Sequence, residues 1–127
     1  MFDQICLKNH HHQFTLDETG EKITFIYVPF LKLFIISDVD GCGPNWFQVK
    51  YFQKIYDIKS IFGSDLNDEY SAIVRFLSEP VVAFYLSKSN DQVLGDEINL
   101  QFSISLRNKN PSTIRAIRDE FIKYFQQ

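Results

Sequence analysis

The first side chains in the sequence that could bind a metal ion are three consecutive histidines, His10, His11 and His12, with Cys6 nearby. Structural zinc sites usually combine two clusters of Cys or His at turn or helical spacing. Neighbouring residues on a strand point to opposite faces, so one ion cannot easily bind all three imidazoles. We therefore expect no metal site and no cofactor, and we interpret the histidines as part of a polar, exposed segment.

A second candidate site is the segment Asp38-Val39-Asp40-Gly41, whose acidic spacing resembles the opening of a calcium loop. The further acidic ligands and the closing Glu of such a loop are missing from the sequence that follows. We therefore predict a tight turn here. Because the segment is rich in glycine and exposed, we place Asp38 and Asp40 in a loop that contacts a partner.

Cys42 is the remaining candidate for covalent chemistry. It lies between Gly41 and Gly43, and no histidine is near it in the sequence. A cysteine nucleophile needs a base within reach and a third group that orients the base. The sequence also contains no G-x-S-x-G, H-E-x-x-H, P-loop or dinucleotide-binding motif. We therefore expect that the protein is not an enzyme.

Composition limits the class of protein and of partner. The chain has 127 residues, 45% hydrophobic and 23% charged, which is typical of a single globular domain over residues 1–127. Its formal net charge is −3, so we expect no broad basic face and no nucleic-acid partner. Aromatic residues make up 16% of the chain, with 13 Phe. This surplus fits either A/T-rich codons or a contact surface that is buried against another protein.

The sequence also contains no obvious membrane segment. Its longest mostly apolar stretch, residues 26–36, contains Pro29 and Lys32. It is much shorter than the roughly 20 residues that a membrane-spanning helix needs. The first residues show neither the charged region nor the apolar stretch of a signal peptide. We expect no membrane contact and a cytoplasmic location, with the nucleus also open.

The first half of the chain has the pattern of β-strands. Residues 1–12 are the least patterned, and we expect them to be either loosely held or an edge strand. Segments rich in β-branched and aromatic residues follow at 14–16, 22–28, 31–37 and 46–56. The links between them are too short for parallel crossovers, so they predict an antiparallel meander.

The period of the apolar residues then changes. Tyr70, Ile73, Val74 and Leu77 have helical spacing, and Pro80 is expected to end this helix. Residues 81–86 predict a strand, and residues 98–106 alternate strictly between apolar and polar. The pair Asn110-Pro111 predicts the start of a last helix. The order ββββ-α-ββ-α gives an α+β fold with an antiparallel sheet of about six strands and two helices.

Several of these strands are apolar on both faces, although an antiparallel sheet with one solvated face should alternate. Two helices can cover only one face of six strands. We therefore predict that the second face is used for dimerisation, with Trp46, Phe52 and Tyr56 on it. The alternative is that one helix covers each face.

The C-terminal part of this acidic chain is basic. Arg115 and Arg118 lie near the start of the last predicted helix, after Arg107 and Lys109. Positive charge at a helix N-terminus is unfavourable, which indicates an acidic partner. A solvated helix face is the alternative interpretation.

The order of elements and the C-terminal half resemble the proteasome assembly chaperone 3 family. The resembling residues are the segments 61–65, 81–84, 107–109 and 114–118, together with the strand to Leu106. The resemblance implies a non-enzymatic chaperone that pairs with a like subunit or with a homologous fourth assembly chaperone. It also implies binding to α-type subunits of the 20S core particle during α-ring assembly.

The chain departs from this family in its histidine run and in the acidic loop 87–97, which contains Asp91 and Asp96. We expect this loop and the loop 38–45 to determine partner specificity. The second hypothesis is a longin-like or profilin-like adaptor domain that binds a GTPase, a coiled-coil peptide or actin. The residues that we expect to bind a partner are Trp46, Phe52, Tyr56, Asp38, Asp40, Asp91, Asp96, Arg115 and Arg118.

Overall fold

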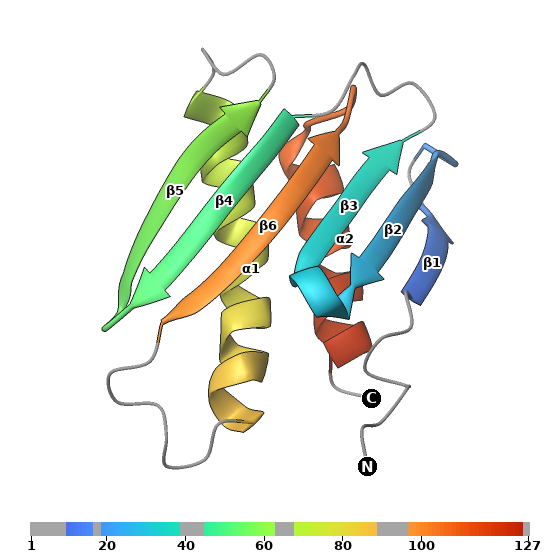
Figure 1. Ribbon diagram of the computed structural model, residues 1–127. Helices are drawn as coiled ribbons and strands as arrows, with labels where there is room; N and C mark the ends of the chain where they lie inside the picture. The colour runs from blue at the N-terminus through green and yellow to red at the C-terminus, as the bar shows by residue number, and fades with distance from the viewer. Residues whose placement is uncertain (1–9, 17–18, 39–44, 63–67, 89–96, 126–127) are drawn as a thin grey trace.

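The computed structural model describes residues 10–16, 19–38, 45–62, 68–88 and 97–125 (Figure 1). Its elements are β1 (His10–Thr15), β2 (Lys22–Val28), the 3₁₀ helix η2 (Pro29–Leu31), β3 (Leu33–Asp38), β4 (Asn45–Phe52), β5 (Ile55–Phe62), α1 (Asp68–Lys88), β6 (Ile98–Ser105) and α2 (Pro111–Phe125). The predicted α+β fold with six strands and two helices is confirmed. The predicted element order is wrong, because the observed order is βββββ-α-β-α.

The sheet has the strand order β1-β2-β3-β6-β4-β5, so the last strand is inserted in its middle. β6 is parallel to β3 and antiparallel to β4, with Phe34 opposite Phe102 and Phe47 also opposite Phe102. The expectation of a purely antiparallel sheet is therefore corrected to a mixed sheet. The predicted meander fails at β3 and β4, because β6 lies between them and separates them by two strand spacings, or about 10 Å.

The predicted strand 46–56 is a hairpin, in which β4 and β5 are joined by Gln53 and Lys54. Both turn residues have positive φ, 50° and 68°, the combination that a type I′ turn requires. Asn and Gly normally occupy these positions, so the turn has no sequence signal. The turn reverses the chain, and the residues from Ile55 to Ser60 lie on the face opposite to the one that a continuous strand would give them, up to the register shift that pairs Phe62 with Trp46.

The unusual turn gives a stability prediction. We expect the double substitution Gln53→Asn and Lys54→Gly to raise the free energy of unfolding by about 1 kcal/mol, because both new residues tolerate positive φ. Urea denaturation monitored by circular dichroism measures the change. The same pair introduced at the solvated helix positions Ala72 and Ala83 should lower stability, because Asn and Gly are poor helix formers. A loss of stability in the turn variant would contradict the hairpin assignment.

The predicted strand 81–86 is the second half of α1, which continues through Pro80. Proline normally breaks a helix because it lacks an N–H and its ring crowds the carbonyl four residues earlier, here that of Phe76. The Nε of Arg118 on α2 donates to this carbonyl at 3.2 Å. The apolar residues that resembled a strand are helical, and two of them, Val81 and Val82, are buried in the core, where they are 0% and 2% exposed. A contact between the helices therefore replaces the hydrogen bond that Pro80 cannot make.

Both helices pack on the same face of the sheet (Figure 1). The side chains between these layers form one core, and its largest fully buried members are Phe25, Phe34, Phe47, Phe102 and Phe121. The ring of Phe121 on α2 lies 4.7 Å from that of Phe25 on β2, between centroids. The alternative with one helix on each face is therefore wrong, and no described element covers the other face of the sheet.

The histidine run lies in β1, an edge strand of the sheet. Of the two alternatives for residues 10–12, a loosely held segment or an edge strand, the second is therefore correct. Residues 1–9 lie outside the described residues. The histidine side chains alternate, as predicted for a strand. His12 Nε2 is 3.1 Å from Glu120 Oε1 of α2, and the His10 ring packs on Tyr27 and Tyr124. Only His11 is exposed, so the expectation of a wholly exposed segment is corrected.

Candidate partner-binding face

The sheet face that points away from the helices is the candidate binding surface, and we call it the open face. Strand register aligns one residue from each of five strands in a row across it. In sheet order from β2 to β5, this apolar row is Ile26, Ile35, Ser103, Trp46 and Phe62. Apart from the small Ser103, every side chain in the row is apolar or aromatic. A continuous apolar band therefore crosses almost the whole sheet.

Trp46 lies between Ser103 and Phe62 in this row and is partly exposed. Its indole Nε1 donates to Gln101 Oε1 at 2.9 Å, which fixes the orientation of the ring on the sheet surface. A partly exposed Trp whose one polar atom already has a partner can be buried by another protein without leaving an unpaired donor. The structure thus places Trp46 on the open face, as predicted.

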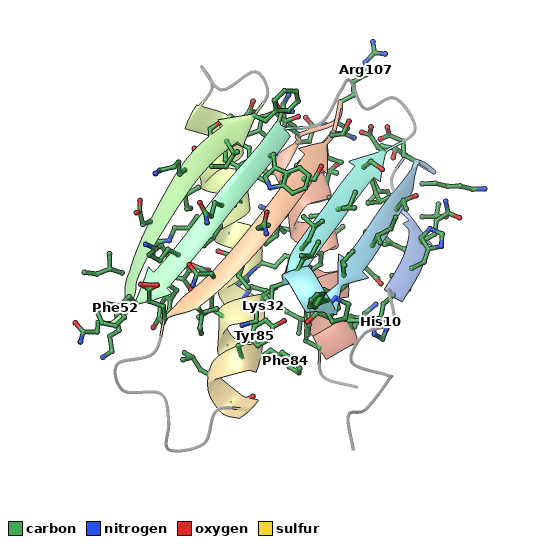
Figure 2. The ribbon with its side chains drawn as sticks, in the orientation of Figure 1. His10, Lys32, Phe52, Phe84, Tyr85 and Arg107 are labelled. Carbon is green, nitrogen blue, oxygen red and sulfur yellow. The ribbon has the colours of Figure 1, made fainter. Side chains whose placement is uncertain are left out.

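Further apolar side chains are exposed at the end of the sheet that lies away from Trp46 and Phe62, and Gln48 and Lys50 separate them from the row along β4. Phe30 and Leu31 of η2, in the link between β2 and β3, are 71% and 51% exposed. At the β4–β5 hairpin, Phe52 and Ile55 lie opposite each other and are 37% and 69% exposed (Figure 2). Phe52 therefore lies on the open face as predicted, while the exposed Phe30, Leu31, Ile55 and Phe62 were missed. Ile55 was missed because the turn at Gln53 and Lys54 has no sequence signal.

Tyr56 does not share a face with Trp46 and Phe52, which corrects the prediction. It follows the hairpin turn, so its side chain lies on the helix side, 4.9 Å from the ring of Tyr51. The Arg75 guanidinium of α1 lies over the Tyr56 ring at 4.7 Å. Burial raises the pKa of the Tyr56 phenol above its ordinary value, and the nearby Glu79 carboxylate raises it further.

Asp38 lies inside the protein rather than in an exposed contact loop. Asp38 is the last residue of β3, and it is 8% exposed. Oδ2 accepts hydrogen bonds from the backbone N–H groups of Arg107 at 2.9 Å and Asn108 at 3.2 Å. Asp38 therefore ties the end of β3 to the link between β6 and α2. Its expected role as a contact residue is corrected to an anchoring role within the fold.

The other charged residues of the prediction differ in their placement. Arg118 is committed to α1: it hydrogen-bonds Phe76 and pairs with Glu79 Oε1 at 3.3 Å. Arg115 is exposed on α2, so its contact with an acidic partner stays a prediction. Asp40, Asp91 and Asp96 lie outside the described residues.

A group of tyrosines joins β2 to both helices near the C-terminal end of α1. The hydroxyls of Tyr27 and Tyr85 are hydrogen-bonded, and the Lys32 ammonium lies 5.1 Å from the Tyr85 ring centre (Figure 2). Burial and the bond to Tyr27 raise the pKa of Tyr85. Burial, with a contribution from Tyr27, also raises the pKa of Tyr124 to about 12. These phenols therefore stay neutral at physiological pH and act as packing groups.

The described residues contain no cluster of three or more His, Cys, Asp or Glu that could hold a metal ion. Among them, no helix is long and apolar enough to cross a membrane.

Comparison with known proteins gives a similarity in structure only. No family model matches the sequence, and no curated protein matches it. Among solved structures, the chain is similar to a chain of the crystal structure of a novel chaperone complex for yeast 20S proteasome assembly. The TM-score is 0.66 at 9% sequence identity, and the match covers 93% of this chain and 98% of that chain.

This similarity shows a shared fold over nearly the full length of both chains. It includes the sheet that carries the open face, because 93% coverage leaves room for only a few unmatched residues. At 9% identity the side chains of the two proteins differ almost everywhere. The similarity therefore concerns the fold, and the apolar row is established by the residues of this chain alone.

Proposed function

We propose that this protein is a non-enzymatic chaperone that pairs through its open face and binds proteasome α-type subunits to assist assembly of the 20S α-ring. The observation that carries the proposal is the fold that it shares, over 93% of its length, with a chain of a yeast proteasome assembly chaperone complex. The pairing partner is either a second copy or a homologous subunit. The cytoplasm is the proposed location, with the nucleus also open.

The open face supports the pairing part of this proposal. Large apolar side chains in one band are expensive to leave in water, and each contributes roughly 1.5–3 kcal/mol when it becomes fully buried. Because none of the described elements covers the band, the protein gains by covering it with another protein, after the loss of rigid-body freedom is subtracted. The mostly hydrophobic row is the kind of surface found at the centre of protein interfaces.

Such a pair could assist assembly by templating. The two-layer core is rigid, so a surface built on it holds a bound subunit in one orientation relative to its neighbours. Loops on that scaffold provide the specificity, because they can vary while the sheet stays fixed. Release then requires a later partner that competes for the same surface or clashes with the chaperone.

Capture of purified proteasome subunits tests the proposal. We expect the immobilised protein to retain free α-type subunits and to retain neither free β-type subunits nor the completed 20S particle. Binding is measured with each subunit separately, so that the specificity for one α-type subunit is resolved. Failure to retain any α-type subunit, together with retention of a GTPase, a coiled-coil peptide or actin, would refute the chaperone and favour the adaptor.

A further inference from the structure

β5 forms a free edge of the sheet, and nothing among the described residues pairs with its outer side (Figure 1). It has eight residues, Ile55–Phe62, and a 54% exposed Ile61 near its end. Edge strands of this length present unpaired backbone groups on which another strand can add. Proteins usually protect such an edge with proline or charged side chains; β5 has no proline, and its two charged residues, Asp57 and Lys59, are of opposite sign.

The hairpin fixes which backbone groups of β5 point outward. A two-residue turn closes on a hydrogen-bonded pair, here Phe52 and Ile55, and such pairs then alternate along the ladder. Asp57 and Lys59 therefore direct their backbone groups toward β4. The N–H and C=O groups of Tyr56, Ile58 and Ser60 point to the open edge, and a strand added there would pair with these three residues.

The side chains of β5 are complementary to a reversed copy of the same strand. If two copies of β5 lie antiparallel with Ile58 opposite Ile58, then Tyr56 faces Ser60 of the second copy. All the residues with outward backbone groups then meet one another, as a ladder requires. The same register places Asp57 opposite Lys59 of the second copy, and by symmetry Lys59 opposite its Asp57.

These facing positions are well placed for such pairs. Asp57 and Lys59 are exposed, and their side chains lie on the open face. Directly opposite residues of adjacent antiparallel strands have Cβ atoms about 5 Å apart, and opposite charges there are stabilising. On the helix side, the half-buried Ile58 would meet its own copy beside a groove of about 540 Å³ between β5 and α1.

We infer that β5 is a second interface of this protein, at which two copies pair edge to edge into one continuous sheet. The strand that pairs with β5 is β5 of a second copy of this chain. In the antiparallel register, its opposite charges face each other and its outward backbone groups meet. In a two-fold interface of this kind, each favourable contact occurs twice. The interface lies at the edge of the sheet and does not involve the apolar row, and the inference does not depend on the proposed function.

The other sheet edge offers no comparable match. β1 has six residues and a run of three histidines, and it contains no pair of opposite charges. Two of its histidines, His10 and His12, already pack on Tyr124 and pair with Glu120 of α2. We therefore assign the pairing to β5 alone.

Charge exchange tests the interface. Asp57→Lys places two lysine pairs across the edge, and Lys59→Asp places two aspartate pairs there. We expect each single variant to raise the edge dissociation constant by roughly 10–50-fold, because attraction becomes repulsion at two sites. Sedimentation equilibrium at several concentrations and at low salt measures this change.

The double variant Asp57→Lys with Lys59→Asp is the matched control, because it restores both opposite pairs across the edge. Asp57 also lies opposite Lys50 of β4, but Asp57→Lys places the same repulsion there in the single and the double variant. Comparison of Asp57→Lys with the double variant therefore holds this contact with β4 constant, while the charge that faces position 57 across the edge changes sign. We expect the double variant, and also an equimolar mixture of the two single variants, to regain the assembly of the unaltered protein.

If the single variants assemble as the unaltered protein does, there is no edge interface. If the double variant or the mixture stays as weak as the single variants, the proposed register is wrong. Circular dichroism spectra of all three variants establish that they are folded. None of these outcomes affects the capture of α-type subunits, so the interface and the proposed function can fail independently.

Discussion

Ile35→Asp is expected to halve the molar mass of the assembled protein. Ile35 lies in the apolar row between Ile26 and Ser103, on a central strand of the open face. A carboxylate there would have to be buried without a partner when a second subunit covers the row, which costs several kcal/mol. We therefore expect association through the open face to weaken at least about 100-fold. Light scattering coupled to size-exclusion chromatography measures the mass.

Gln48→Asp is the control for this substitution. Gln48 is an exposed residue of the open face on the interior strand β4, outside the apolar row. It controls for the low strand propensity of Asp and for the added charge. We expect the mass to stay that of the unaltered protein. If Ile35→Asp leaves the mass unchanged while its circular dichroism spectrum is native, then the open face is not an interface.

The second large effect concerns the contact that allows α1 to continue through Pro80. Arg118→Met is expected to lower the free energy of unfolding by about 2–3 kcal/mol. It leaves the Phe76 carbonyl, which Pro80 cannot satisfy, without its donor, and hydrogen bonds from charged groups contribute about 1.5–3 kcal/mol. It also removes the guanidinium that lies 4.5 Å from the Phe76 ring centre. The long apolar Met side chain keeps most of the packing. Urea denaturation at neutral pH measures the loss.

A double-mutant cycle with Pro80→Ala isolates the reason for this loss. Alanine at position 80 supplies the helical N–H for the Phe76 carbonyl, so that the guanidinium becomes less important. We expect Arg118→Met to cost about 1 kcal/mol less in the Pro80→Ala protein than in the unaltered one. Equal costs in both backgrounds would mean that Arg118 stabilises the protein only through its contacts with Glu79 and the Phe76 ring.

The two failures of the secondary-structure prediction have different physical causes. At residues 81–86, local rules correctly identified Pro80 as a helix breaker, but a side chain 38 residues later on another helix restores the missing bond. At residues 53–54, the turn uses Gln and Lys in a backbone conformation that these residues rarely adopt. Strand pairing over the length of the hairpin imposes this conformation, and local propensity does not predict it.

The candidate site was predicted only in part for the same reasons. The excess of apolar strand residues predicted an uncovered face, and Trp46 and Phe52 lie on it. The error at the hairpin placed Tyr56 on the wrong face, because one misjudged turn reverses the side-chain alternation after it. Asp38 was taken for a loop residue because nothing local indicates that the N–H groups of Arg107 and Asn108 lie beside it.

The sequence alone determined the α+β class, the start of α2 at Pro111 and the excess of apolar β-surface, because periodicity and capping act over a few residues. The tertiary structure decided where β6 inserts, how the apolar residues of five strands align in one row, and which backbone groups of β5 point outward. These features depend on register between segments far apart in the chain. Register follows from the packing of the whole core, so it could be read only from the folded protein.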